Sequence, residues 1–200
     1  MNGATNVLMA GFGGQGMLLA GKLLAQAAMN EGLAVSWLPS YGPEMRGGTA
    51  NVIVCLSPHD IGSPIVDHPL ALLAMNRPSL DKFAPRVAPG GLIVVNKTLI
   101  EVDAERIDCT VIEVPSRELA SAAGTDRAAN IVMLGAYVGA TGVLPEPAVE
   151  QAIASELKGK KQQWIPANLA AFAAGLALGR EAAATPVSAA SSDNNGSSES

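Results

Sequence analysis

The chain has 200 residues, of which 48% are hydrophobic, 16% charged and 4% aromatic, and 21 are glycines. This length accommodates one domain with a substantial core, and the apolar content excludes a disordered chain. A net charge of −5 argues against a general surface for nucleic acid or for an anionic membrane.

No apolar run reaches the roughly 18 residues that a membrane-spanning helix needs. The first residues lack the basic segment of a signal peptide. The two cysteines, Cys55 and Cys109, form no CxxC pair, so we expect no iron–sulfur cluster and no metal site on this chain alone. A cytoplasmic protein is the simplest interpretation.

The first part of the chain predicts a βαβ unit. Its elements are a strand at 6–10, a glycine-rich turn at 11–16, a helix at 17–30 and a strand at 34–38. Lys22, Gln26 and Asn30 recur every fourth residue and give this helix one narrow polar stripe on an otherwise apolar surface.

The remaining pattern completes an α/β domain. Further strands are expected at 49–56, 70–75, 92–96 and 109–114, with one helix at 78–87; the last third predicts helices at 116–123, 127–141, 146–157 and 167–180. We expect an open, mainly parallel sheet in one domain over residues 1–181. Residues 182–200 are rich in Ser, Asn and Ala and predict a disordered tail.

The run GFGGQG at 11–16 matches G-x-G-x-x-G between a strand and a helix. Such a turn exposes backbone N–H groups at a helix N-terminus and suits a phosphate. The same pattern also occurs as a plain tight turn, so both interpretations stay open.

Two nucleotide-binding signatures are absent beside this turn. A nicotinamide dinucleotide site needs an acid at the end of the second strand, but that strand ends at Leu38 and Pro39. An independent NAD(P)-binding oxidoreductase is therefore the weaker alternative. No Gly-Lys-Ser/Thr follows the turn, which excludes a P-loop.

Two basic residues are candidates for an anion contact. Lys22 lies in the second turn of the helix and either reaches back toward Gly13–Gly16 or is a solvated surface lysine. Arg46 lies in a loop rich in Gly and Pro after the second strand, and either binds a ligand or partner or pairs with Glu44.

No catalytic set is recognisable. His59 and His68 lie in a proline-rich connection without metal-ligand spacing, and Cys55 lies in an apolar strand as a core thiol would. An anion-binding turn without an evident acid, base or nucleophile is typical of a binding subunit.

Four motifs in fixed order resemble a known family. They are GFGGQG at 11–16, SYGPEMRGG at 40–48, DIGSP at 60–64 and ANIVMLG at 129–135, and NLAAF at 168–172 is also similar to the family's ending. Over residues 6–179 the chain resembles the gamma subunit of 2-oxoacid:ferredoxin (acceptor) oxidoreductases. Purely structural and ligand-binding roles both remain compatible with this resemblance.

The resemblance implies a subunit that is not catalytic alone. These complexes convert a 2-oxoacid and coenzyme A to an acyl-CoA and carbon dioxide, with ferredoxin or another acceptor taking the electrons. Thiamine diphosphate, magnesium and iron–sulfur clusters belong to the partner chains, which are alpha, beta and in some complexes a ferredoxin-like delta subunit. A related domain of single-chain pyruvate enzymes is implicated in holding coenzyme A. Carried over to this sequence, the coenzyme A contacts are Gly11, Gly13, Gly14, Gln15, Gly16, Lys22, Arg46, Gly47 and Gly48.

Overall fold

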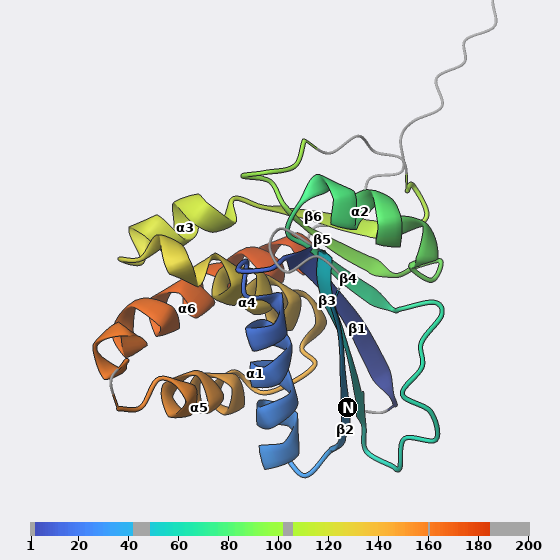
Figure 1. Ribbon diagram of the computed structural model, residues 1–200, viewed down its shortest axis with the longest axis horizontal. Coiled ribbons are helices and arrows are strands. Elements are labelled where there is room, and N and C mark those ends of the chain that lie inside the picture. Colours follow the sequence, from blue (N-terminus) through green and yellow to red (C-terminus); the bar gives the residue numbers. More distant parts are fainter. Residues whose placement is uncertain (1–2, 42–48, 102–105, 160, 185–200) are drawn as a thin grey trace, which may run out of the picture.

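The computed structural model describes residues 3–41, 49–101, 106–159 and 161–184. Within them, a six-stranded sheet has the strand order β2-β3-β1-β4-β5-β6 (Figure 1). The strands are β1 (Thr5–Phe12), β2 (Ala34–Tyr41), β3 (Thr49–Ser57), β4 (Ala71–Ala74), β5 (Leu92–Asn96) and β6 (Thr110–Val114).

Helices occupy most of the remaining described chain. They are α1 (Met17–Asn30), α2 (Arg77–Phe83), α3 (Ser116–Ala122), α4 (Ala129–Thr141), α5 (Glu146–Glu156) and α6 (Ile165–Ala184). Short 3-10 turns extend α2 at Ala84–Arg86 and precede α4 at Asp126–Ala128 and α6 at Gln162–Trp164.

The sheet is parallel over four strands and antiparallel at one edge. β1, β4, β5 and β6 pair in parallel, whereas β3 runs antiparallel to both β1 and β2. The predicted βαβ unit therefore has β3 inserted between its two strands. β3 is nearly continuously apolar, as suits an interior strand, whereas β2 is half polar, as suits an edge.

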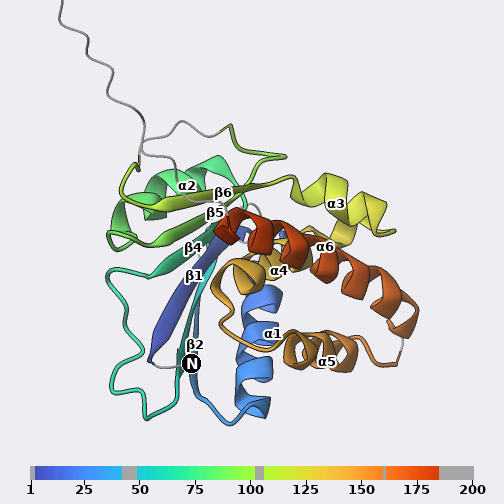
Figure 2. The ribbon, with the colours of Figure 1, turned by 180° about the vertical axis from the view of Figure 1, so that it is seen from behind.

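The two faces of the sheet are covered unequally. Helices α1 and α3 to α6 cover one face, and α2 alone covers the other (Figures 1 and 2). The first face carries the larger core, which includes Val52, Val54, Ile131 and Phe172. The second core, under α2, includes Leu8, Leu72 and Phe83.

Helices α4 and α6 approach each other closely through glycine. Gly135 and Gly139 on α4 face Gly175 and Gly179 on α6, and a Cβ added at any of the four would collide with backbone of the opposite helix. This contact holds α4 against α6 along its length, because neither helix can shift without opening the close backbone packing.

The predicted helices are confirmed to within a few residues. α6 continues to Ala184, past the expected domain boundary at residue 181. The other residues of the expected tail, 185–200, lie outside the described part of the chain. Among the described residues, no helix is both long and apolar enough to cross a membrane.

Candidate functional site

The carboxyl ends of the four parallel strands meet at one edge of the sheet, and the glycine turn lies there. In open α/β sheets this is the edge at which ligands bind. The turn at residues 11–16 connects the end of β1 to the start of α1.

The turn has a conformation that only glycine adopts readily. The N–H of Gln15 donates to the carbonyl of Phe12 at 3.1 Å and closes the turn. Gly14 has a φ of 97° and Gly16 a φ of 77°, in the left-handed region that side chains disfavour. The sequence pattern thus reflects a real backbone requirement at these two positions.

Two backbone N–H groups of the turn remain available. Gly13 and Gly14 are exposed, and no described residue accepts a hydrogen bond from either N–H. A Cβ built at either position meets nothing within 4 Å. Within the described part of the chain, the turn therefore has two exposed backbone donors without an acceptor, a feature that suits an anion.

A second helix begins beside the turn. The amide Nδ2 of Asn130, in the first turn of α4, donates to the carbonyl of Gly16 at 3.0 Å. Neither α1 nor α4 has a side-chain cap at its N-terminus. The N-termini of two helices of 14 and 13 residues thus lie next to Gly16, and α4 is preceded by a 3-10 turn that Thr125 caps and that carries Asp126.

The side chain of Gln15 folds back over the turn and does not project into the open space. Its Oε1 accepts the N–H of Phe12 at 2.7 Å and the Nδ2 of Asn76 at 2.8 Å. A Cβ at Gly11 would lie 2.8 Å from this Oε1, so Gly11 leaves room for the amide.

A chain of amides continues across the strand ends. The Nδ2 of Asn96, at the end of β5, donates to the carbonyl of Met75 at 3.2 Å. The hydroxyl of Ser116, after β6, donates to Asn96 Oδ1 at 2.8 Å. These hydrogen bonds form a polar row along the carboxyl edge, in the strand order β1-β4-β5-β6. Its side chains are those of Gln15, Asn76, Asn96 and Ser116.

Sequence reasoning missed Asn76, Asn96, Ser116 and Asn130. All four are polar yet buried, and each lies at a strand end or a helix start. A lone Asn or Ser directly after an apolar strand is the signal that could have identified three of them. Asn130 lies within the ANIVMLG motif, and its hydrogen bond to Gly16 gives that motif a physical role.

Lys22 has a partner other than the glycine turn. Its Nζ lies 2.7 Å from Glu156 Oε2 on α5, and the side chain is 57% exposed. Gln26 and Asn30, the other members of the polar stripe, hydrogen-bond to each other at 3.0 Å. The stripe is therefore exposed as predicted, with Lys22 in an ion pair between two helices.

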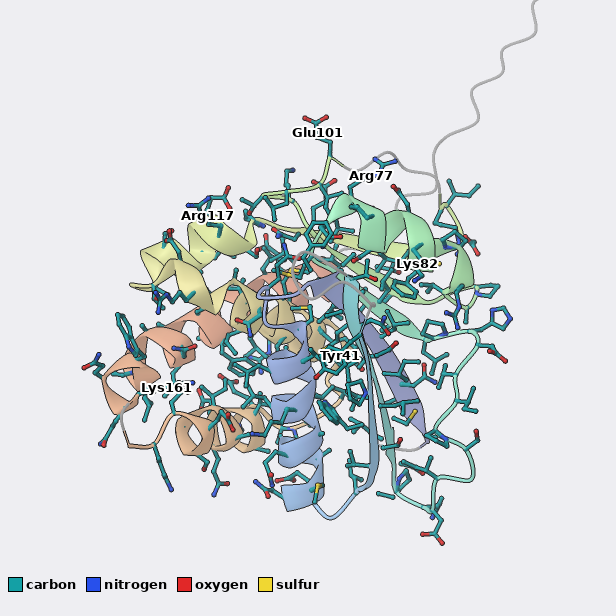
Figure 3. All side chains as sticks on the ribbon, viewed as in Figure 1. Tyr41, Arg77, Lys82, Glu101, Arg117 and Lys161 are labelled. Atoms are coloured by element: carbon teal, nitrogen blue, oxygen red, sulfur yellow. The ribbon has the colours of Figure 1, made fainter. Side chains whose placement is uncertain are left out.

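The expected contacts Arg46, Gly47 and Gly48 lie outside the described residues. Tyr41, at the end of β2 just before them, is 69% exposed. Figure 3 labels Tyr41, Arg77 on α2 and Arg117 on α3, which lie apart from one another. These two arginines already bind carboxylates, Arg77 to Asp81 at 2.6 Å and Arg117 to Asp126 at 3.6 Å.

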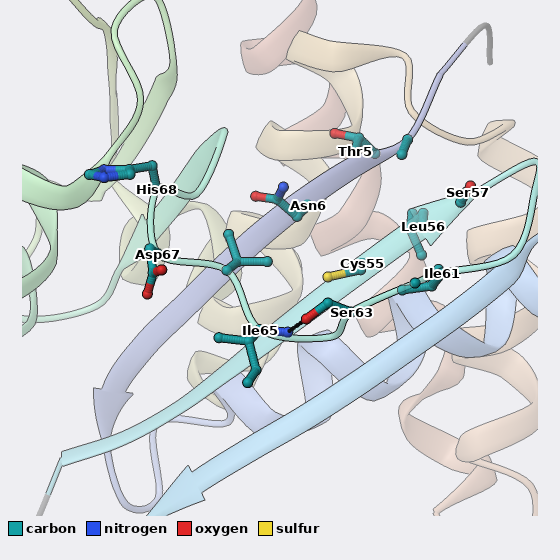
Figure 4. A pocket seen from close by; sticks show the side chains of 13 residues that line it. Thr5, Asn6, Cys55, Leu56, Ser57, Ile61, Ser63, Ile65, Asp67 and His68 are labelled. Atoms are coloured by element: carbon teal, nitrogen blue, oxygen red, sulfur yellow. Dashed lines mark hydrogen bonds between the residues drawn. The ribbon is translucent and has the colours of Figure 1, made fainter.

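A separate cavity of about 440 Å³ lies at the other end of β1, below the connection between β3 and β4 (Figure 4). Several of its polar groups are engaged within the chain: Asn6 accepts the N–H of Leu70, and Ser57 accepts that of His59. His68 lies in the same exposed connection, with Nδ1 at 3.2 Å from the carbonyl of Arg86. The two histidines are loop residues, as the sequence indicated.

Cys55 lines this cavity as a buried thiol, and burial raises its pKa. Within the described ranges, no cluster of three His, Cys, Asp or Glu side chains has the arrangement of a metal site.

The fold and the turn define an open α/β domain with a glycine-rich turn at its carboxyl edge. Residues 6–178 match the family model described as pyruvate ferredoxin/flavodoxin oxidoreductase. The chain belongs to this family.

Relatives in this family are oxidoreductase subunits. The chain is 46% identical over 177 residues to the ketoisovalerate oxidoreductase subunit VorA of Methanothermobacter thermautotrophicus; this covers 88% of the chain and 36% of VorA. It is 33% identical over 179 residues to the 2-oxoglutarate synthase subunit KorC of Methanocaldococcus jannaschii, covering 88% of the chain and 94% of KorC. The chain thus spans about a third of the VorA relatives that it matches and nearly all of KorC.

Solved structures share the fold. The gamma subunit of a keto/oxoacid ferredoxin oxidoreductase from Geobacter sulfurreducens has a TM-score of 0.80 and 30% identity, covering 90% of this chain and 98% of that one. The 2-oxoglutarate:ferredoxin oxidoreductase of Magnetococcus marinus, determined with 2-oxoglutarate, coenzyme A and succinyl-CoA, has a TM-score of 0.83, and the match covers 90% of this chain and 32% of that one. At 23% identity the latter likeness concerns the fold alone.

Proposed function

We propose that this chain is the gamma subunit of a 2-oxoacid:ferredoxin oxidoreductase and contributes the binding of coenzyme A. The family membership and the KorC relative, matched over 94% of its length, support the assignment to such a complex. The observation that carries the ligand assignment is that no described residue accepts a hydrogen bond from the exposed N–H groups of Gly13 and Gly14.

The proposed reaction joins a 2-oxoacid, coenzyme A and two oxidised ferredoxins. It yields an acyl-CoA, carbon dioxide, two reduced ferredoxins and a proton. Thiamine diphosphate with magnesium supplies the carbanion chemistry, and iron–sulfur clusters carry the electrons. We assign these groups to alpha, beta and delta partner subunits in a cytoplasmic complex, in keeping with the two free cysteines of this chain.

The role of this chain in the proposal is to hold the pyrophosphate of coenzyme A. The N–H groups of Gly13 and Gly14 donate to its oxygens, and the starts of α1 and α4 supply the favourable field. Gly11 and Gly16 give the turn its shape. Lys22 is a second contact that must leave Glu156 to reach the anion, and Arg46, Gly47 and Gly48 complete the set. We place the site in the single α/β domain, which the sequence predicts over residues 1–181 and in which α6 continues to Ala184.

The strand order disfavours the NAD(P) alternative. In dinucleotide-binding folds the second strand lies beside the first and carries the acid that binds the ribose. Here β3 separates β2 from β1, and β2 ends without an acid.

A charge-reversal experiment at the turn tests the proposal. A side chain at Gly13 meets open space, so Gly13→Asp brings a carboxylate to the anion site without a steric clash, and Gly13→Asn is its neutral control. We expect isothermal titration of the full chain with coenzyme A to give a dissociation constant about tenfold higher for Gly13→Asp than for Gly13→Asn, because the added carboxylate repels the pyrophosphate and about 1.4 kcal/mol corresponds to a factor of ten.

Three outcomes would contradict the proposal. Equal affinities for the Asp and Asn variants would place coenzyme A elsewhere. A wild-type chain that binds NAD(H) but not coenzyme A would favour the dinucleotide alternative. A purely structural subunit would bind neither ligand.

A further inference from the structure

We infer that Asn76 and Gln15 are positioning residues that hold the glycine turn in its anion-accepting conformation, and that the Gln15 side chain does not contact the anion. This inference rests on the proposed function for the identity of the ligand. The structural relationship between the two side chains stands independently of that ligand.

The first step concerns how Gln15 restrains the turn. Its Oε1 accepts the N–H of Phe12 at 2.7 Å, while its own backbone N–H donates to the Phe12 carbonyl at 3.1 Å. The two polar backbone groups of Phe12 are thus both engaged by one residue. This fixes the peptide planes on either side of Gly13 and Gly14, whose own N–H groups have no acceptor among the described residues.

The second step concerns what orients the Gln15 amide. Asn76 donates its Nδ2 to Gln15 Oε1 at 2.8 Å, which requires that this atom be the oxygen. Gln15 Nε2 then faces the carbonyl of Met75 at 3.5 Å. A reversed amide would set two donors against each other at Asn76 and leave Phe12 N–H without an acceptor.

The third step concerns what fixes Asn76. It is 4% exposed and is the N-cap of α2, where its Oδ1 accepts the N–H of Ser79 at 2.9 Å. Its oxygen is committed to the helix, so its amide nitrogen is directed at Gln15. A single buried residue therefore links the start of α2 to the conformation of the turn.

Asn76→Ser separates the two roles of Asn76. Serine is as good an N-cap as asparagine, but it lacks the nitrogen that reaches Gln15. Two variants at Gln15 form a matched pair. Gln15→Met removes the oxygen that accepts the Phe12 N–H at nearly constant side-chain size, and Gln15→Glu retains an oxygen there.

The first readout needs no ligand. Amide hydrogen exchange of the full chain, followed by NMR, should show the Phe12 N–H exchanging about tenfold faster in Gln15→Met and about threefold faster in Asn76→Ser, as the loss or weakening of one hydrogen bond implies. Exchange at Ser79 should stay unchanged in Asn76→Ser, because the cap is kept. Gln15→Glu should leave Phe12 protected.

The second readout is the dissociation constant of coenzyme A, measured by titration. We expect about a fivefold increase in Asn76→Ser and no further increase when Asn76→Ser is added to Gln15→Met, since a positioning residue acts through its partner. Additive effects in this double-mutant cycle would mean that Asn76 acts separately, and would overturn the inference. So would unchanged Phe12 exchange in Gln15→Met.

Failure of the proposed function looks different. A wild-type chain that does not bind coenzyme A, but in which Phe12 exchange responds as expected, would remove the ligand and keep the positioning relationship. Conversely, coenzyme A binding that is intact in Gln15→Met and Asn76→Ser would keep the ligand and remove the positioning role.

Discussion

The ammonium of Lys22 on α1 lies 2.7 Å from the carboxylate of Glu156 on α5, in an ion pair whose side chains are 57% and 30% exposed. Exposed pairs of this kind stabilise a fold by only about 0–1 kcal/mol, so a phosphate can compete for the lysine. Lys22 lies about 9 Å along the helix axis from Gly16. The ion pair thus joins α1 to α5. It also holds the Lys22 ammonium at Glu156 and not at the glycine turn.

This competition gives opposite effects for the two partners. We expect Lys22→Ala to raise the dissociation constant of coenzyme A about tenfold, because a charge-assisted contact is lost. Glu156→Gln should lower this dissociation constant about twofold, because Lys22 then gives up no ion pair when it binds the phosphate. Titrations at low and high salt check both values. Unchanged affinity in both variants would show that the pair only joins α1 to α5.

The hydroxyl of Ser79 offers a test of the packing under α2. Its Oγ is buried and has no hydrogen-bond partner among the described residues, although its backbone N–H donates to Asn76 Oδ1. Removing an unsatisfied buried polar group is nearly neutral or stabilising, and alanine is the better helix former. Ser79→Ala should raise the free energy of unfolding by about 0.5 kcal/mol, measured by urea denaturation. A loss of more than about 1 kcal/mol would mean that the hydroxyl has a partner.

The fold was largely predictable from local patterns. Apolar runs such as 71–74 and 92–96 indicate buried strands, and glycines at positions 16 and 32 bound α1 on both sides. The order of strands was not predictable in this way. Whether β3 or β2 lies beside β1 depends on pairing over a long sequence separation, and the sequence carries only the indirect signal that β3 is the more apolar strand.

The site was predictable only where backbone geometry demands a residue type. Gly14 and Gly16 have positive φ, so glycine itself marks the position. The position of Asn76 and Asn96 at the ends of apolar strands makes them candidates, but only their partners show that they are buried, because a polar residue after a strand is also compatible with an exposed loop. The Lys22 partner also lies on a distant helix, and nothing near position 22 indicates Glu156.

Cys55 provides a prediction on pH. Burial raises the pKa of its thiol, so between the unfolded and folded pKa values the folded state retains a proton that the unfolded state has lost. The contribution of this group is fully present below the unfolded value of about 8.5 and is lost as the pH rises above it. Wild type should therefore lose more free energy of unfolding between pH 7.5 and pH 9.5 than Cys55→Ala, measured by denaturation at both pH values. Parallel declines would contradict a raised pKa.

The contact between α4 and α6 gives the sharpest prediction on stability. A Cβ at Gly175 would overlap the carbonyl of Val132 and come within 3.0 Å of the N–H nitrogen of Ala136. Both obstacles are backbone, so the helices must separate, and the interior has no space for this. We expect Gly175→Ala to destabilise the fold by about 3 kcal/mol or more, against the usual gain from replacing glycine in a helix.

The control lies two residues away on the same helix. Ala177 is exposed, so Ala177→Gly changes helix propensity alone and should cost about 1 kcal/mol. Thermal denaturation of both variants compares the loss of stability from the α4–α6 clash at Gly175 with the loss from lower helix propensity at position 177. Asn130 on α4 donates to the carbonyl of Gly16 in the turn, so a displaced α4 would disturb the turn. A folded Gly175→Ala variant should therefore also bind coenzyme A more weakly than Ala177→Gly. A Gly175→Ala variant as stable as wild type would show that α4 and α6 lie further apart than the close packing described above.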